Sequence, residues 1–148
     1  MDIENLLKLL SEHKTKFIII GAAAFPVHGY VRTTLDVDIF IKPTAHNARN
    51  CLEALRDFGY DVTDITVEDL LKKKVLIRQY LLEVDLHPFV KGVKFIDVWK
   101  HKVKDKIGKT DAYFASLDDL IRMKKAAGRP KDKEDLKILL RLKKRKKS

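Results

Sequence analysis

The segment Thr34-Leu35-Asp36-Val37-Asp38-Ile39-Phe40-Ile41 decides the fold, because it places two carboxylates within a run of mostly apolar residues. Side chains alternate between the two faces of a strand, so Asp36 and Asp38 lie on one face and the branched aliphatic residues on the other. Carboxylates this close repel each other unless a cation or a solvated surface compensates. Hard oxygen donors suit Mg²⁺. We therefore expect a strand that carries a metal site; the alternative is the solvated face of an edge strand.

A second segment with the same alternation lies at residues 82–87, overlapping the end of a stretch rich in β-forming residues at 75–86. One of its faces is apolar, and Glu83, Asp85 and His87 share the other. A third carboxylate is therefore available for the site, supplied by either Glu83 or Asp85. The spacing of the histidines, His87 included, matches no metal-ligand motif, so the sequence predicts no histidine ligand.

Gly21 follows a short run of branched apolar residues at 17–20 and precedes an alanine-rich stretch, 22–28, that can form a helix. A glycine has no Cβ, so a phosphate group can approach the backbone there, and the free N–H groups at the start of a helix attract anions. Strand, glycine and helix also occur together as ordinary chain punctuation. The Asp-x-Asp strand that follows favours the phosphate interpretation.

The remaining pattern predicts an α/β fold, with a mixed, twisted sheet, flanking helices and a C-terminal helical pair that forms one wall of a cleft. Further helices are predicted at residues 1–10, 45–58, 66–73, 95–102, 116–127 and 130–142, and further strands at 60–62, 103–107 and 113–115. We expect one domain, residues 1–142, followed by a basic tail, residues 143–148, whose simplest interpretation is a solvated segment.

Composition narrows the class of protein. The chain has 148 residues, 45% of them apolar, and a formal net charge of +10. No apolar run approaches the roughly 20 residues that span a bilayer, and the N-terminal stretch lacks the basic region of a signal peptide. Cys51, the single cysteine, falls among apolar helix positions and fits a reducing compartment. We expect a cytoplasmic protein with no membrane partner and an anionic substrate or partner.

Several of these motifs occur together in a known family. The segments Gly21-Ala-Ala-Ala24, His28-Gly29, Arg32, Thr34, Asp36-Val-Asp38 and Val84-Asp85-Leu86 resemble the nucleotidyltransferase superfamily of the DNA polymerase β type. The resemblance covers roughly residues 17–142. The closing segment, residues 120–135, is similar to the C-terminal helices of small bacterial and archaeal members, which include the AbiEii-like toxins.

The resemblance implies a metal site and its ligands. Asp36, Asp38 and Asp85 match the family's carboxylates, which bind two Mg²⁺ ions, with Mn²⁺ as a substitute, and help to activate the acceptor. Asp85 is favoured over Glu83 because it has the Val-Asp-Leu setting of the family's strand. Two cations a few Å apart stabilise both the attacking and the leaving oxygen in phosphoryl displacement.

The resemblance also implies contacts to the triphosphate. Gly21 and Ala22 match the family's glycine turn, which usually reads Gly-Gly or Gly-Ser; Ala22 lacks the hydroxyl, so only backbone N–H groups remain for phosphate. Thr34 belongs to the same motif. Arg32, Lys124 and Arg129 match places from which a cation reaches phosphate, although lysine and arginine on a loop or helix are also common as solvated charges.

The implied activity is Mg²⁺-dependent transfer of a nucleoside monophosphate from ATP or another nucleoside triphosphate to a hydroxyl acceptor. RNA ends (a tRNA among them) fit the basic surface, and protein hydroxyls and small molecules remain open. The toxin resemblance implies a toxin–antitoxin pair with an antitoxin protein as partner. Two alternatives stay open: a catalytically inactive module that binds nucleic acid or a protein, and a glycosyltransferase that uses its Asp-x-Asp for one metal.

Overall fold

A mixed sheet organises the computed structural model, which describes residues 2–147. Within these residues the sheet has six strands in the order β3-β4-β2-β1-β6-β5. Strand β2 runs antiparallel to β1 and parallel to β4, and β1 runs parallel to β6. The strands are β1 (Phe17–Ile20), β2 (Asp36–Ile41), β3 (Val75–Ile77), β4 (Glu83–His87), β5 (Val103–Ile107) and β6 (Thr110–Phe114). The α/β prediction is confirmed.

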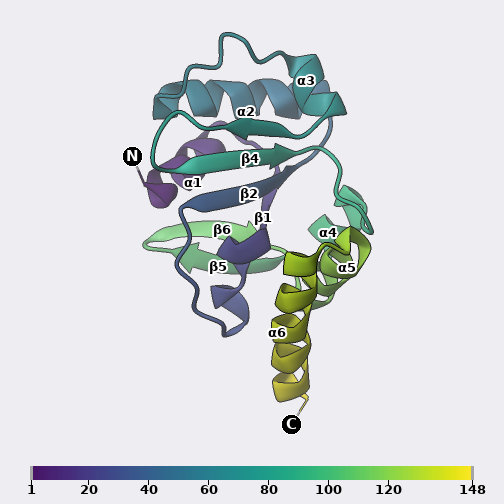
Figure 1. Ribbon diagram of the computed structural model, residues 1–148. Helices are drawn as coiled ribbons and strands as arrows, with labels where there is room; N and C mark the ends of the chain where they lie inside the picture. Colours follow the sequence, from purple (N-terminus) through teal and green to yellow (C-terminus); the bar gives the residue numbers. More distant parts are fainter. Residues whose placement is uncertain (1, 148) are drawn as a thin grey trace.

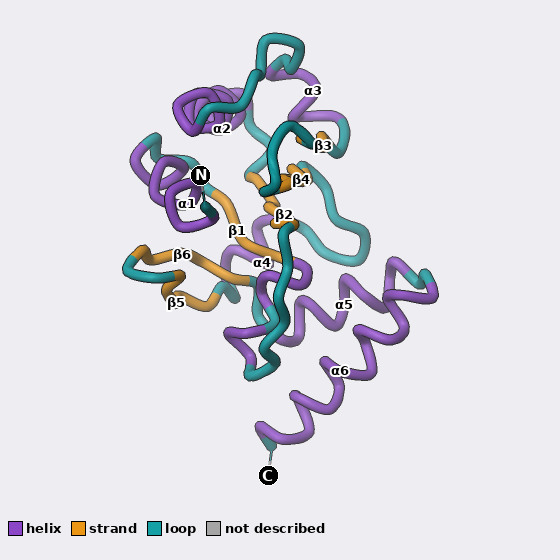
Figure 2. Tube along the Cα trace, turned by 60° about the vertical axis from the view of Figure 1, so that its left-hand side comes forward, coloured by secondary structure: helices purple, strands orange, loops and turns teal. Residues whose placement is uncertain are grey.

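Helices pack around this sheet in two groups. Figure 2 shows α1 and α2 on one side of the sheet and α5 and α6 on the other, while α6 projects away and carries the C-terminus at its far end (Figure 1). The α-helices are α1 (Ile3–Glu12), α2 (Ala45–Phe58), α3 (Val67–Lys72), α4 (Phe95–Lys100), α5 (Leu117–Ala127) and α6 (Pro130–Lys146). None of the helices described within residues 2–147 is long and apolar enough to cross a membrane.

Helix α2 forms as its sequence predicts. The Thr44 hydroxyl accepts a hydrogen bond from the Asn47 N–H at the start, and Gly59, with φ of 119°, ends the helix in the left-handed region. Its apolar stripe is buried against the sheet. Cys51 lies in that stripe with no exposed surface, and burial raises the pKa of its thiol to about 12. The thiol is therefore an inert packing group.

The predicted helix at residues 22–28 is wrong, because the structure has two 3₁₀ turns, η1 (Gly21–Ala24) and η2 (Pro26–His28). Pro26 has no N–H to continue a helix begun at Gly21, and it starts the second turn instead.

The predicted strand at residues 60–62 is also wrong. The Asp61 N–H donates to the Gln79 side chain at 2.7 Å, and the Tyr60 hydroxyl donates to the Leu82 carbonyl at 2.7 Å, so side-chain contacts replace ladder pairing.

Other boundaries move by a few residues. The β-rich stretch 75–86 divides into β3 and β4, β2 begins at Asp36 instead of residue 34, and Leu35 is exposed. The basic run is helical through Lys146, so most of the predicted tail continues α6. Met1 and Ser148, which belonged to the predicted first helix and tail, lie outside the described residues. Trp99 stacks on Phe95 with ring centroids 5.7 Å apart.

Asn47 joins α2 to two strands. Its side chain is buried, accepts from the Lys16 N–H at 2.7 Å, and donates to the carbonyls of Lys16 and Lys42 at 2.9 and 3.0 Å.

We expect Asn47→Ala to lower the free energy of unfolding by about 2–4 kcal/mol, because three backbone groups lose their partner in a buried place. Urea unfolding measures this. Asn50→Ala, whose side chain contacts only exposed His46 at 3.4 Å, is the control, and an equal loss for both would contradict the prediction.

Candidate active site in the cleft between the sheet and the C-terminal helices

A cleft of about 520 Å³ lies between the acidic strands and the helical pair α5 and α6. Its volume is in the range of small-molecule sites. The predicted wall is present, since Leu120 and Met123 of α5 and Asp132 and Asp135 of α6 line the cleft. All the predicted site residues also line it: Gly21, Ala22, Arg32, Thr34, Asp36, Asp38, Asp85, Lys124 and Arg129.

The parallel register of β2 and β4 places the acidic side chains in two facing pairs. Asp36 lies opposite Glu83, and Asp38 lies opposite Asp85. The outer pair is more open to solvent, whereas the Asp38 and Asp85 side chains keep only 29% and 12% of their surface. Like charges directly across a sheet destabilise it unless a cation intervenes. The inner pair is therefore the place where a cation has most effect.

His87 completes a group that the sequence did not predict. Its Nε2 lies 2.8 Å from Asp38 Oδ1, and ligand atoms of Asp38, Asp85 and His87 all lie within 4.8 Å of one another. The expectation of no histidine ligand relied on spacing between histidines. The available signal was parity instead, because His87 lies two residues after Asp85 and so on the same strand face.

Asp38 is held as a carboxylate by this arrangement. Burial by itself would raise its pKa, but the hydrogen bond and charge of His87, followed by Lys74 and Lys124, lower the pKa below the ordinary value. Asp36 is not part of the His87 group. It is exposed, and its carboxyl group raises the pKa of neighbouring Glu83, as does burial.

Arg78 supplies a protein cation to both acids of β4. Its Nη1 lies 2.6 Å from Asp85 Oδ1, and its Nε lies 3.1 Å from Glu83 Oε2. The Asp85 contact is the main reason that the pKa of Arg78 is raised. Lys74 approaches the other oxygen of Asp85, at 3.9 Å. Asp85 Oδ2 is thus the less occupied oxygen of that carboxylate.

Gly21 is required by its neighbour Asp38. Its φ is 68°, and a Cβ added there would lie 2.6 Å from Asp38 Oδ2. Any side chain at this position would displace the carboxylate. The turn after Gly21 is a short 3₁₀ turn, so the α-helix N-terminus predicted at this place is absent. Thr34 is used locally: its Oγ1 bonds the backbone of Asp36 at 3.1 Å and fixes the start of β2.

The predicted phosphate-binding cations are paired with two carboxylates of α6. Arg32 contacts Asp135 at 2.9 Å, Lys124 contacts Asp135 at 3.1 Å and Asp132 at 3.3 Å, and Arg129 contacts Asp132 at 2.6 Å. Asp132 is fully buried, and the Arg129 hydrogen bond is the largest influence that lowers its pKa, to about 2. Burial raises the pKa of Asp135, but Arg32 and Lys124 outweigh it. The three cations are therefore held at fixed places on the cleft wall.

Comparison with known proteins was made against this geometry. Residues 1–141 match a family model described as "Nucleotidyltransferase of unknown function (DUF6036)". The chain belongs to this family. A search of curated proteins finds no significant match. Among solved structures, the fold is similar to that of a "putative nucleotidyltransferase (TM1012)" from Thermotoga maritima, with a TM-score of 0.60 and 15% identity over 92% of this chain and 88% of that chain.

Membership of the nucleotidyltransferase superfamily is thus confirmed, and the structural neighbour supports the fold alone at that identity. The family match extends from the first residue into α6 and so includes every residue that lines the acidic cleft.

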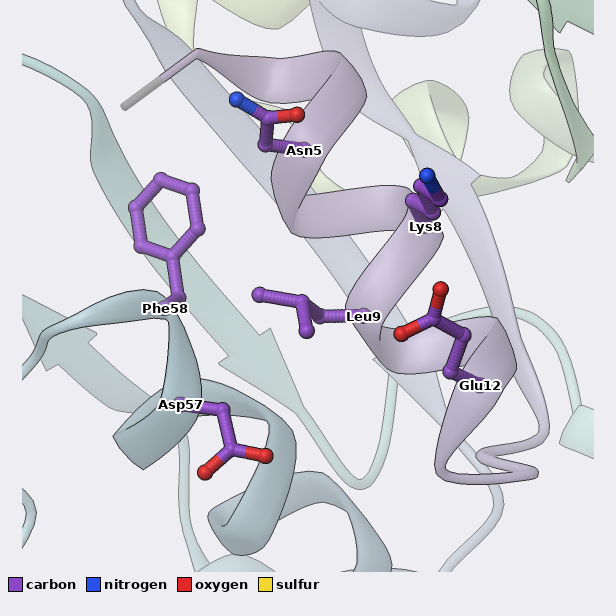
Figure 3. A pocket seen from close by; sticks show the side chains of 6 residues that line it. All are labelled: Asn5, Lys8, Leu9, Glu12, Asp57 and Phe58. Carbon is purple, nitrogen blue, oxygen red and sulfur yellow. The ribbon is translucent and has the colours of Figure 1, made fainter.

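A second hollow of the molecule lies between α1 and the end of α2 (Figure 3). It has a volume of about 330 Å³ and is lined by Asn5, Lys8, Leu9, Glu12, Asp57 and Phe58. In Figure 3 Leu9 and Phe58 lie between the helices, while the charged groups spread around the rim. The hollow contains none of the motif residues and no converging set of ligands, so the acidic cleft remains the candidate site.

We expect Gly21→Ala to destabilise the fold by about 3 kcal/mol, because left-handed strain of about 1–2 kcal/mol adds to overpacking against Asp38. Gly128→Ala is a matched control, since Gly128 has a φ of 66° and its Cβ would meet only Lys125 O at 4.0 Å. It should lose only the strain component. Urea unfolding compares the two variants, and equal losses would show that Asp38 yields freely.

We expect Asp132→Asn to lower the free energy of unfolding by about 2 kcal/mol at pH 7, because one unit of pKa shift corresponds to about 1.4 kcal/mol. The folded-state pKa, about 2, is below the ordinary 3.8. The stabilisation is therefore fully present above pH 4 and disappears as the pH falls through about 2. Urea unfolding at several pH values measures this. Glu134→Gln, an exposed change on the same helix, should have no such effect.

Proposed function

We propose that this chain catalyses metal-dependent transfer of a nucleoside monophosphate from a nucleoside triphosphate to a hydroxyl acceptor. The observation that carries the proposal is the facing pair Asp38 and Asp85 at the floor of a cleft whose opposite wall holds Lys124 and Arg129. Negative groups on one side suit a divalent cation, and cations on the other suit phosphates. A nucleoside triphosphate bound to a divalent cation needs both.

The donor set fits such a cation. Asp38 and Asp85 present carboxylate oxygens to one space, and the missing Cβ of Gly21 leaves room beside Asp38 Oδ2. Asp38 and Asp85 would hold the metal, Asp36 from the outer pair joining them as the family resemblance implies. When bound, divalent cations stabilise charge on the attacking and leaving oxygens.

The protein's own residues would perform the remaining work. Backbone N–H groups at Gly21 and Ala22, together with Arg32, Lys124 and Arg129, would hold the triphosphate in line with the acceptor. Asp85 would orient the acceptor hydroxyl and take its proton. The acceptor oxygen forms a bond to the α-phosphorus as the bond from that phosphorus to the bridging oxygen breaks, and pyrophosphate leaves.

The acceptor is proposed to be an RNA end, a tRNA among them, because the cleft adjoins α6, whose exposed face is rich in lysine and arginine. Protein hydroxyls and small molecules are the other candidates. A toxin role with a cognate antitoxin follows from the AbiEii-like resemblance of residues 120–135. Expression of the chain alone and with genes encoded beside it would test that role.

A second candidate is a catalytically inactive module of the same fold. The observation in its favour is that each inner carboxylate already has a protein partner: His87 contacts Asp38, and Arg78 contacts Asp85. In that case the carboxylates are structural, and the cleft binds nucleic acid or a protein without turnover.

Titration calorimetry with nucleoside triphosphates, with and without Mg²⁺, separates the two candidates. For the enzyme we expect binding that requires the metal and is lost in Asp38→Asn. Glu68→Gln, which removes an exposed acid of α3 outside the cleft, should bind as the wild type does. Metal-independent binding of RNA with no triphosphate binding would favour the inactive module.

We expect Asp36→Asn to abolish transfer while leaving the free energy of unfolding unchanged or slightly raised. Removing this charge relieves repulsion with Glu83, its neighbour across the strands. Product formation from labelled triphosphate and urea unfolding are the two measurements. A large loss of stability would instead identify Asp36 as a structural residue.

A further inference from the structure

The side chain of His87 reaches into the acidic cleft from the same strand face as Asp85. It keeps only 15% of its surface, and its Nε2 lies 2.8 Å from Asp38 Oδ1. With Asp85 it offers a nitrogen and two carboxylate oxygens whose ligand atoms lie within 4.8 Å of one another. Such a group can serve two purposes: His87 can orient Asp38, or it can bind the metal ion itself.

The distance fits neighbouring ligands of one ion. Two adjacent ligands of an octahedral ion, each about 2.1 Å from it, lie about 3 Å apart. The imidazole and the Asp38 carboxylate are already at that separation, and the ion-pair contact of Asp85 Oδ2, to Lys74, is a long one of 3.9 Å. The three groups therefore lie close enough to be drawn together as ligands of one ion.

Orientation of Asp38 does not require the histidine. The strand register places Asp38 opposite Asp85, and its Oδ2 lies against Gly21. In metal sites a carboxylate usually stands behind a histidine ligand and away from the ion. Here the nitrogen and both carboxylates converge on one side, which is the arrangement of a ligand set.

An imidazole nitrogen changes which ion is preferred. Mg²⁺ takes oxygen ligands and keeps several waters, whereas first-row transition ions also accept imidazole. Among these, Mn²⁺ shares the preference of Mg²⁺ for carboxylates. We infer that His87 is a metal ligand and that the site therefore binds Mn²⁺ in preference to Mg²⁺. This inference rests on the proposed function, because it names the ion of the same site.

The test uses Mn²⁺ alone, without a nucleotide. Electron paramagnetic resonance of free Mn²⁺ gives the number of bound ions and their affinity, and competition gives the affinity for Mg²⁺. Electron spin echo modulation detects a nitrogen bound directly to Mn²⁺. We expect one ion with nitrogen modulation in the wild type. In His87→Ala the modulation should disappear and Mn²⁺ binding should weaken about tenfold or more, with little change for Mg²⁺.

Two further variants serve as controls. His101→Ala removes a histidine that contacts Asp119 at 3.1 Å, outside the cleft, and should leave the modulation intact. His87→Gln can still hydrogen-bond to Asp38 but has no imidazole, so it should fold and yet lose the nitrogen signal. It also covers the case in which His87→Ala unfolds.

Three results would overturn the inference: nitrogen modulation that persists in both His87 variants, absence of Mn²⁺ binding to the wild type, or equal weakening of Mn²⁺ and Mg²⁺ binding. The last would make His87 a positioning residue.

Failure of the proposed function gives a different set of results. If Mn²⁺ is bound by a nitrogen but no acceptor receives a nucleotide, the inference about His87 stands and the proposed activity is refuted. If transfer occurs and Mn²⁺ has only oxygen ligands, the proposed activity stands and the inference about His87 is refuted.

Discussion

The parallel pairing of β2 with β4 is the constraint on which the rest of the structure depends. It sets Asp38 against Asp85 and Asp36 against Glu83, a register that repulsion alone would disfavour. The register persists because the opposite faces of both strands are core: Val37, Ile39, Val84 and Leu86 have no exposed surface. A slip of one residue would bury the carboxylates and expose that apolar set. Apolar burial therefore holds the acids together.

The charges of the cleft are balanced by chain segments distant in sequence. His87 and Arg78 approach the inner carboxylates from β4 and the loop before it, while α6 contributes Asp132 and Asp135 to hold the cations of the facing wall. Each ionic group is thus partly neutralised before any substrate enters. A bound triphosphate and its metal would exchange these partners instead of meeting bare charges, which lowers the desolvation penalty on both sides.

Much of this could be read from the sequence. Period-two alternation predicted the two acidic strands, the helix pattern at 45–58 and 116–127 predicted α2 and α5, and the motif set predicted the superfamily, which is confirmed. Strand parity placed His87 on the acidic face, but its contact with Asp38 depends on the pairing of β2 with β4 and was not predicted. The pairing of Arg32 and Lys124 with α6 could not be predicted, because Arg32 and Asp135 are 103 residues apart in the chain and no local pattern joins them. The two misassigned elements have local causes: Pro26 prevents a continuous helix at residues 22–28, and side-chain hydrogen bonds replace strand pairing at residues 60–62.

The continuity of α6 has a mechanical consequence. Its 17 residues extend about 25 Å as one rod. Acidic side chains at its first turns touch the cations of the cleft, and a cluster of lysines and arginine occupies its last turns. Lys143 forms an ion pair with Asp118 of α5 at 2.9 Å, so the far end of α6 also contacts α5. Because the helix is continuous, any force applied to its basic end would be transmitted to Asp132 and Asp135, and through them to the cations of the cleft wall.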